Sequence, residues 1–165
     1  MDVANLNEHS LIFDRNCDTT YDTTYERTLM HGMTPEFDTF LSAHRWAVLT
    51  CLRRSGSPVN SVVAYAREGN DFVVSTPGAT FKRAAIGRDP RVNLCAISNS
   101  EPFNFVALEG AAHIQVDDIA EPTRRVFAAI EDTGWKIPDP LDDWLIAQSR
   151  VILRIKPERI SGVIR

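Results

Sequence analysis

The stretch of this chain richest in chemically useful residues is VVSTPGATFKRAAIGRDPRV, residues 73–92. In this stretch an apolar strand ends, a glycine permits a tight turn, and a helix begins. Backbone N–H groups at a helix start have no intrahelical partner, and they attract anions. Thr76 and Thr80 can add hydroxyl donors, and Lys82, with Arg83 beside it, adds full positive charge. This combination of donors is suited to a phosphate group.

A purely structural role explains the same residues equally well. Thr80 is of a residue type that often caps helices, and Lys82 and Arg83 have the character of surface charges. On physical grounds alone, a phosphate site and a capped helix with surface charges explain these residues equally well.

No other group of side chains in the sequence is typical of catalysis or of metal binding. The chain contains neither GxSxG nor HExxH, its four histidines are scattered, and its three cysteines form no CxxC pair. The acidic pairs Asp117-Asp118 and Asp142-Asp143 fall in expected turns or at expected helix starts, where solvated carboxylates are common. We therefore predict no catalytic side chain and no metal site.

Composition excludes several classes of partner. The chain has 165 residues, 44% apolar and 24% charged, the balance of one globular domain. Its 22 acidic and 18 basic residues give a net charge of −4, which argues against nucleic acid and anionic membranes as partners. No stretch approaches the ~20 apolar residues of a membrane span. The first residues also lack the pattern of a signal peptide. We expect a soluble, cytoplasmic protein with reduced cysteines.

Residues 1–32 differ from the rest, because they are polar, rich in threonine and contain the repeat DTTY. We expect an N-terminal arm that packs on the domain or on a partner subunit, with a loosely ordered tail as the alternative. The domain proper spans residues 33–165. Its first helix begins at Thr34-Pro35-Glu36, which combines an N-cap, a proline at the first helical position and an acid in the first turn.

Short apolar runs separated by turns predict a small antiparallel barrel. Strands are expected over residues 46–53, 59–66, 71–76, 91–98, 104–116 and 151–157. Further helices are expected over residues 80–88, 121–134 and 141–147. Gly110, inside the long fifth strand, indicates a bulge of the kind that curls a sheet. The order of elements lacks the βαβ alternation of a Rossmann fold.

Four segments spread over about residues 34–165 together resemble one known family. They are PEFDTFLSAHRWAVLTCLRRSGSPVNSVVAY, STPGATFKRAAIGRDPRVNLCAI, VALEGAAHI and RVILRIKPERISGV, and their order and spacing match its layout. The chain is similar to the pyridoxamine 5′-phosphate oxidase-like superfamily of flavin and deazaflavin proteins, above all to small actinobacterial enzymes that use coenzyme F-420. The resemblance implies a mainly β fold with flanking helices, a six- to seven-stranded antiparallel split β-barrel.

The resemblance also implies where a cofactor binds. In this family a threonine that closes the third strand and a Ser/Thr-x-Lys motif that opens the helix hold the cofactor phosphate. Those positions are here Thr76, Thr80 and Lys82. The second strand of the family passes along the flavin or deazaflavin ring. The residues implied beside the ring are Asn60, Ser61 and Val62.

One position departs from the family pattern. The common asparagine is replaced by Ala85, which removes one phosphate or ribityl contact. Arg88 and Arg91 match the pattern, but turn capping and pairing with Asp89 explain them equally well.

Family members are dimers with the cofactor at the subunit interface, so the resemblance implies a homodimer. Trp135 and Trp144 could then help to wall the pocket, although core packing explains either one more simply. The lactyl-oligoglutamate tail of coenzyme F-420 favours cationic groups along its groove. The candidates for this role, with exposed surface charges as the alternative, are Arg53, Arg54 and Arg83.

We therefore expect an oxidoreductase that transfers a hydride between coenzyme F-420 and a small organic substrate, with the cofactor carrying the chemistry. One alternative is an FMN-dependent oxidase or reductase of the pyridoxamine phosphate oxidase type. A second is a non-catalytic flavin- or deazaflavin-binding protein, and a third is a purely structural dimerisation domain.

Overall fold

The computed structural model describes residues 33–165, so the N-terminal arm expected over residues 1–32 lies outside the described part. The helices and strands follow one another as α2 (Pro35–Ala43), β1 (Trp46–Leu52), β2 (Pro58–Ala64), β3 (Ala66–Glu68), β4 (Asp71–Thr76), α3 (Phe81–Ile86), β5 (Arg91–Ile97), β6 (Phe105–Gln115), α4 (Ala120–Ala129), the 3-10 turn η1 (Glu131–Thr133), α5 (Leu141–Ala147) and β7 (Val151–Val163). None of these helices is long and apolar enough to cross a lipid bilayer.

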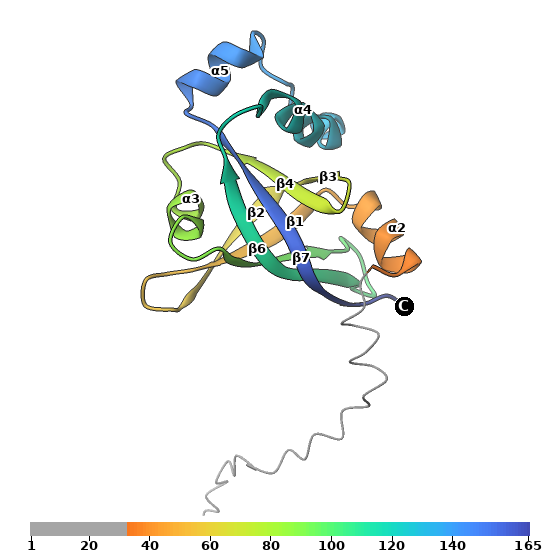
Figure 1. Cartoon of the computed structure of the whole chain (residues 1–165). Coiled ribbons are helices and arrows are strands. Elements are labelled where there is room, and N and C mark those ends of the chain that lie inside the picture. The colour runs from red at the N-terminus through yellow and green to blue at the C-terminus, as the bar shows by residue number, and fades with distance from the viewer. Residues whose placement is uncertain (1–32) are drawn as a thin grey trace, which may run out of the picture.

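The seven strands join one antiparallel sheet in the order β2-β1-β5-β6-β7-β4-β3. The sheet curls on itself, and Figure 1 shows α2 and α3 on opposite sides of it, with α4 and α5 together at the top. The fold is the seven-stranded antiparallel split barrel that the sequence predicts. The C-terminal strand β7 lies inside the sheet between β6 and β4, so it brings the end of the chain against the middle.

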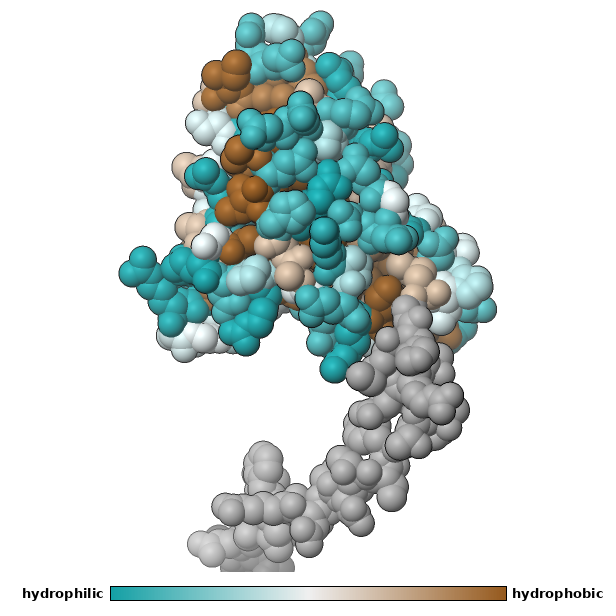
Figure 2. All heavy atoms as spheres, in the orientation of Figure 1, coloured by the Kyte–Doolittle hydropathy of each residue, from teal (hydrophilic) through white to brown (hydrophobic). Residues whose placement is uncertain are grey.

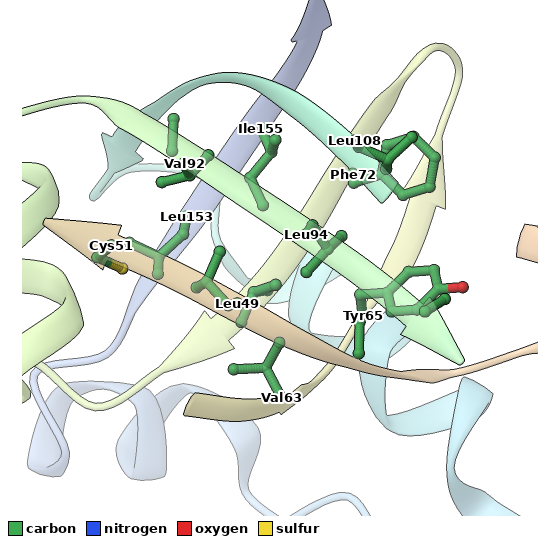
Figure 3. Packing of buried hydrophobic residues seen from close by; sticks show 14 of the residues in the cluster. Leu49, Cys51, Val63, Tyr65, Phe72, Val92, Leu94, Leu108, Leu153 and Ile155 are labelled. Carbon is green, nitrogen blue, oxygen red and sulfur yellow. The ribbon is translucent and has the colours of Figure 1, made fainter. Parts of the chain in front are cut away.

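Apolar side chains from alternate strand positions fill the barrel, because successive side chains of a strand point to opposite faces. In β1 the buried residues are Ala47, Leu49 and Cys51. Figure 3 shows how such side chains converge from several strands. The outer face of β4 and β7 is buried as well, because Val73 and Ile152 pack against Val126 of α4. Helix α4 therefore covers the sheet where β4 and β7 pair.

The strand β6 bends at Gly110, where its register with β7 shifts. A Cβ at Gly110 would overlap the carbonyl oxygen of Lys156, so the two backbones approach too closely for any other residue. The predicted bulge is therefore confirmed. It also lets β7 run past Pro157 to Val163, because the irregular pairing tolerates a residue without an N–H. The expected end of this strand at residue 157 is wrong for that reason.

Two other predicted elements divide at breaks that periodicity does not reveal. The expected strand over 59–66 becomes β2 and the short β3, because the chain changes its pairing partner from β1 to β4 at Tyr65. The hydroxyl of Tyr65 donates to the carbonyl of Leu41 at 2.8 Å, which holds this residue in the buried interior. The expected helix over 121–134 ends as α4 and continues as η1, which stops at Gly134 with φ of +86°.

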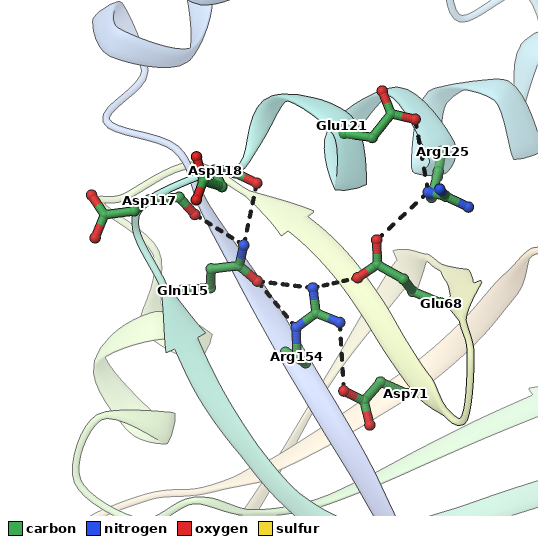
Figure 4. Close-up of polar contacts among 8 residues, drawn as sticks. All are labelled: Glu68, Asp71, Gln115, Asp117, Asp118, Glu121, Arg125 and Arg154. Atoms are coloured by element: carbon green, nitrogen blue, oxygen red, sulfur yellow. Dashed lines mark hydrogen bonds and ion pairs between the residues drawn. The ribbon is translucent and has the colours of Figure 1, made fainter.

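A polar cluster centred on Arg154 ties the outer face of the sheet to α4 (Figure 4). The guanidinium of Arg154 forms ion pairs with Glu68 and with Asp71, the latter at 3.5 Å. It also donates from Nη2 to Gln115 Oε1 at 2.9 Å. Glu68 in turn lies 3.6 Å from the guanidinium of Arg125 on α4. One side chain of β7, only 16% exposed, thereby links β3, β4, β6 and α4.

We predict that Arg154→Ala lowers the free energy of unfolding by about 2–3 kcal/mol, because hydrogen bonds to a charged group are lost and carboxylates stay behind unpaired. Arg159→Ala is the matched control. Arg159 lies on the same strand, is about half exposed and meets Glu109 only at 3.9 Å, so its loss should cost under about 1 kcal/mol. Urea unfolding followed by circular dichroism measures both, and equal effects of the two substitutions would contradict the prediction.

Candidate functional site

The loop of residues 77–80, between β4 and α3, packs directly on the segment that leads into β7. The N–H of Gly78 donates to the carbonyl of Gln148 at 3.1 Å. A Cβ at Gly78 would overlap the carbonyl oxygen of Ser149, so glycine is required for this close approach. The predicted phosphate motif therefore has a second wall, built from a part of the chain that lies far from it in sequence.

The structure brings the two predicted hydroxyls together beside this loop. Thr76 is buried at the end of β4, and its Oγ1 lies 3.4 Å from that of Thr80. The hydroxyl of Thr80 donates to the carbonyl of Pro77 at 3.1 Å. Thr80 occupies the N-cap position of α3, but its side chain makes no capping hydrogen bond. Capping by the side chain therefore does not account for a hydroxyl at this position.

Helix α3 is shorter than the sequence predicts, because it spans Phe81–Ile86 instead of residues 80–88. Residues 87 and 88 close the helix with tightened hydrogen bonds to the carbonyls of Arg83 and Ala85 before the Asp89-Pro90 step. Six residues carry a small macrodipole, so any strong attraction for an anion must come from charged side chains.

Three cations, which we call the cation cluster, surround the loop: Lys82, Arg83 and Arg150. Burial lowers the pKa of the Lys82 ammonium group, and the neighbouring charge of Arg150 lowers it further, while Cys51 acts in the opposite direction. Burial also lowers the pKa of Arg150 to about 10. Both groups are therefore partly removed from water and lie close enough for their charges to interact.

Arg150 is held in place by neighbouring side chains. Its Nε donates to Ser75 Oγ at 3.1 Å, and its guanidinium lies 4.3 Å from the centre of the Trp144 ring. Ser75 Oγ is itself 3.1 Å from the hydroxyl of the fully buried Thr123 on α4. These contacts fix the position of Arg150 without neutralising its charge.

No carboxylate of residues 33–165 forms an ion pair with any member of the cation cluster. Arg83 donates from Nη1 to the carbonyl of Gly78 at 3.3 Å, but its Nε is buried without a hydrogen-bond partner in the described part of the chain. Half-buried positive charges that repel one another are costly unless an anion joins them. Together with the hydroxyls of Thr76 and Thr80, these donors fit a phosphate group.

The three residues expected beside a cofactor ring do not share one face. Asn60 and Val62 lie on the exposed face of β2, where Val62 is 73% exposed, whereas Ser61 alternates to the opposite face. Asn60 accepts a hydrogen bond from Thr50 Oγ1 at 2.8 Å. No hydrogen bond links these residues to the cation cluster within residues 33–165. Strand alternation thus leaves Asn60 and Val62 as a pair.

Other residues of the predicted motif serve local structure. Ala85 is fully buried in the core, so its replacement of asparagine reflects packing. Arg91 donates from Nε and Nη2 to the two carboxylate oxygens of Asp89, which lowers the pKa of Asp89 to about 2. Arg88 donates to the carbonyl of Ala84 at 2.7 Å. These two arginines support the turn before β5, in agreement with the expected roles in turn capping and in pairing with Asp89.

The remaining candidates occupy varied positions. Arg53 lies over the ring of Phe81 at 5.1 Å, and Arg54 is exposed in the turn between β1 and β2. Trp135 is 60% exposed, so the expectation of core packing is wrong for this residue. Trp144 packs edge-on against Phe127. In the part of the chain that the structure describes, no three His, Cys, Asp or Glu side chains gather as metal ligands would.

Arg150 is the member of the site that the sequence does not reveal. It follows α5 at the start of a strand, a position without any motif, and nothing local relates it to Lys82. Only the pairing of β4 with β7, in which Thr76 lies opposite Val151, brings Arg150 to the loop. A correct prediction of that strand pairing would have been the signal needed to find it.

Comparison with known proteins adds to this geometry. Residues 33–164 match the family model described as pyridoxamine 5′-phosphate oxidase. No curated protein matches the chain in sequence. Among solved structures, a conserved hypothetical protein from Mycobacterium tuberculosis aligns with a TM-score of 0.66 and 22% identity, over 79% of this chain and 84% of the other.

Two further structures share the fold. An F420 reductase aligns with a TM-score of 0.66 and 18% identity, over 78% of this chain and 98% of its own. An FAD-binding protein from Mesorhizobium loti aligns with a TM-score of 0.58 and 21% identity, over 77% and 89%. At these identities the comparisons establish the common architecture.

We predict that Gly78→Ala lowers the free energy of unfolding by about 1–3 kcal/mol, because the new methyl group must push the loop away from Ser149. Gly87→Ala is the control, since a Cβ there meets its neighbours at 3.4 Å or more and should change stability by about 0.5 kcal/mol or less. Urea unfolding compares them. A neutral Gly78→Ala would show that the loop does not depend on this contact.

Proposed function

Because the chain belongs to the pyridoxamine 5′-phosphate oxidase family, we propose that it is an oxidoreductase that uses a phosphate-bearing flavin or deazaflavin cofactor. Its reaction is the transfer of a hydride between that cofactor and a small organic substrate. The observation that carries this proposal is the cation cluster, three positive side chains without a carboxylate partner among residues 33–165, placed beside two hydroxyls.

The protein's own part is to bind and orient. Lys82 and Arg150 supply charge to the phosphate, and the hydroxyls of Thr76 and Thr80 lie together beside the loop. The Thr80 hydroxyl donates to the phosphate by turning away from the carbonyl of Pro77, its acceptor in this structure. The ring of the bound cofactor supplies the hydride chemistry, which is why such a protein needs no catalytic triad. The exposed pair Asn60 and Val62 on β2 presents one amide and one apolar side chain to the ring.

Coenzyme F-420 is the cofactor we favour, with FMN as the alternative. The resemblance of the sequence to small F-420-dependent enzymes supports the first, and so does the structural similarity to an F420 reductase. The similarity to an FAD-binding protein supports a flavin. The exposed Arg53 and Arg54, in the turn between β1 and β2, are available to the carboxylates of an F-420 tail.

Ala85 stands where the family commonly has asparagine, but it is part of the hydrophobic core. This replacement therefore does not support the hypothesis that the chain has lost its cofactor site. Turnover separates an enzyme from a carrier of the cofactor. Bound reduced cofactor should be reoxidised faster when electron-accepting substrates are added, and an unchanged rate across acceptor classes would favour a carrier.

We predict that Lys82→Ala weakens cofactor binding by about 1.5–3 kcal/mol, because a charge-assisted hydrogen bond to the phosphate is lost. Lys156→Ala, which removes an exposed lysine of β7, should leave the affinity unchanged. Fluorescence titrations of the cofactor-free protein with coenzyme F-420 and with FMN give the dissociation constants and rank the two cofactors. If Lys82→Ala leaves the dissociation constants of both coenzyme F-420 and FMN unchanged, the proposed phosphate site is wrong.

We also propose that two copies form a homodimer with the cofactor at their interface. Exposed apolar side chains of β2, β5 and β6 support this arrangement, because Val62, Ile97 and Phe105 are 73%, 43% and 37% exposed. The chain has a mass of 18.5 kDa, so light scattering after size-exclusion chromatography should give twice that mass. A monomer at micromolar concentration would contradict the proposal.

A further inference from the structure

A cleft of about 480 Å³ opens between α3 and α5, beyond the end of β6. Its walls come from four parts of the chain, and the side chains that matter are Arg83, Val116, Leu145, Ile146 and Arg150. The volume falls within the range of ordinary small-molecule sites. The cleft adjoins the proposed phosphate site, because Arg83 and Arg150 of the cation cluster also line the cleft.

The inner end of the cleft is positively charged. Arg83 contributes a guanidinium whose Nε is buried and unpartnered among residues 33–165. Arg150 contributes a half-buried guanidinium that Ser75 and Trp144 hold in place. Desolvation strengthens the field of these charges toward an anion. The donors are therefore fixed before any ligand arrives.

Two carboxylates also line the cleft, and their position differs from that of the arginines. Asp118 and Asp142 are exposed at its edge. Neither forms an ion pair with Arg83 or Arg150. Water screens exposed charges far more than half-buried ones. The two arginines are therefore the less screened charges of the cleft.

The side of the cleft is apolar and open to solvent. Val116 is 55% exposed and Ile146 is 77% exposed, and the buried Leu145 also lines the cleft. In Figure 2 apolar surface runs down this face from α5 at the top, past the level of α3. Exposed apolar surface next to half-buried cations that have no carboxylate partner among residues 33–165 is the arrangement that an amphipathic ligand satisfies.

We propose that this cleft binds a small carboxylic acid with an apolar body. The carboxylate lies against Arg83 and Arg150, and the body covers Val116, Leu145 and Ile146. The apolar wall does not suit the polar glutamate tail of coenzyme F-420, and the proposed function places the cofactor ring on β2, so the ligand is a molecule other than the cofactor. The acid and the cofactor phosphate share Arg150, so the inference is tested on the chain without any cofactor, where this guanidinium is open to the acid.

A matched pair of probes tests the proposal. Isothermal titration of the cofactor-free, full-length protein with 2-naphthoate and with 2-naphthamide compares an acid with a neutral molecule of the same shape. The expected result is that the acid binds about tenfold or more tightly, because only the acid gains charge-assisted bonds. Equal affinities, or no binding of the acid, would overturn the proposal.

Variants locate the probe. Arg150→Gln should weaken naphthoate binding about tenfold and leave naphthamide binding unchanged, which also shows that the fold is intact. Ile146→Ser should weaken both probes, since both use the apolar wall. Arg124→Gln, a substitution at an exposed arginine of α4 outside the cleft, should affect neither. An Arg150→Gln protein that binds naphthoate as the wild type does would place the acid elsewhere and contradict the assignment.

Discussion

The close contact between Gly78 and the segment before β7 is the constraint on which the site depends. The pairing of β4 with β7 ends at Thr76 and Val151, and the chain then continues side by side through the hydrogen bond from Gly78 to Gln148. This contact places the start of α3 against Arg150. Without it, Lys82 and Arg83 would be two charges on a short helix, with no reason to attract an anion more than other surface cations do.

Two arginines near the start of β7 have different roles, although they are the same residue type. Arg154 lies among Glu68, Asp71 and Gln115, so its charge is matched and its donors are occupied. Arg150 lies four residues earlier, directly before the strand begins, and its guanidinium meets only a hydroxyl and an aromatic ring. A folded chain tolerates such a group when its neighbours fix it, and the unmatched charge is available to a ligand.

Local chemistry was predictable from the sequence, whereas distant pairings were not. The cap at Thr34, whose Oγ1 accepts the N–H of Phe37 at 3.2 Å, follows from residues three apart. The proximity of Thr76 and Thr80 likewise follows from one tight turn. Arg150 could not be found this way, because its role comes from the pairing of β4 with β7. The placement of Asn60, Ser61 and Val62 beside a ring stays a prediction, and strand alternation puts the side chain of Ser61 on the face opposite to the other two.

The central claim is that the cation cluster and its two hydroxyls hold a cofactor phosphate. The most direct measurement compares FMN with riboflavin, which lacks only the phosphate, and coenzyme F-420 with its ribityl-deazaflavin core, which lacks the phosphate and the tail. Fluorescence titration of the cofactor-free protein gives the four dissociation constants. The account predicts that, in the pair that binds, the phosphate-bearing molecule binds about tenfold or more tightly. Equal affinity within that pair, or no binding of either pair, would contradict it.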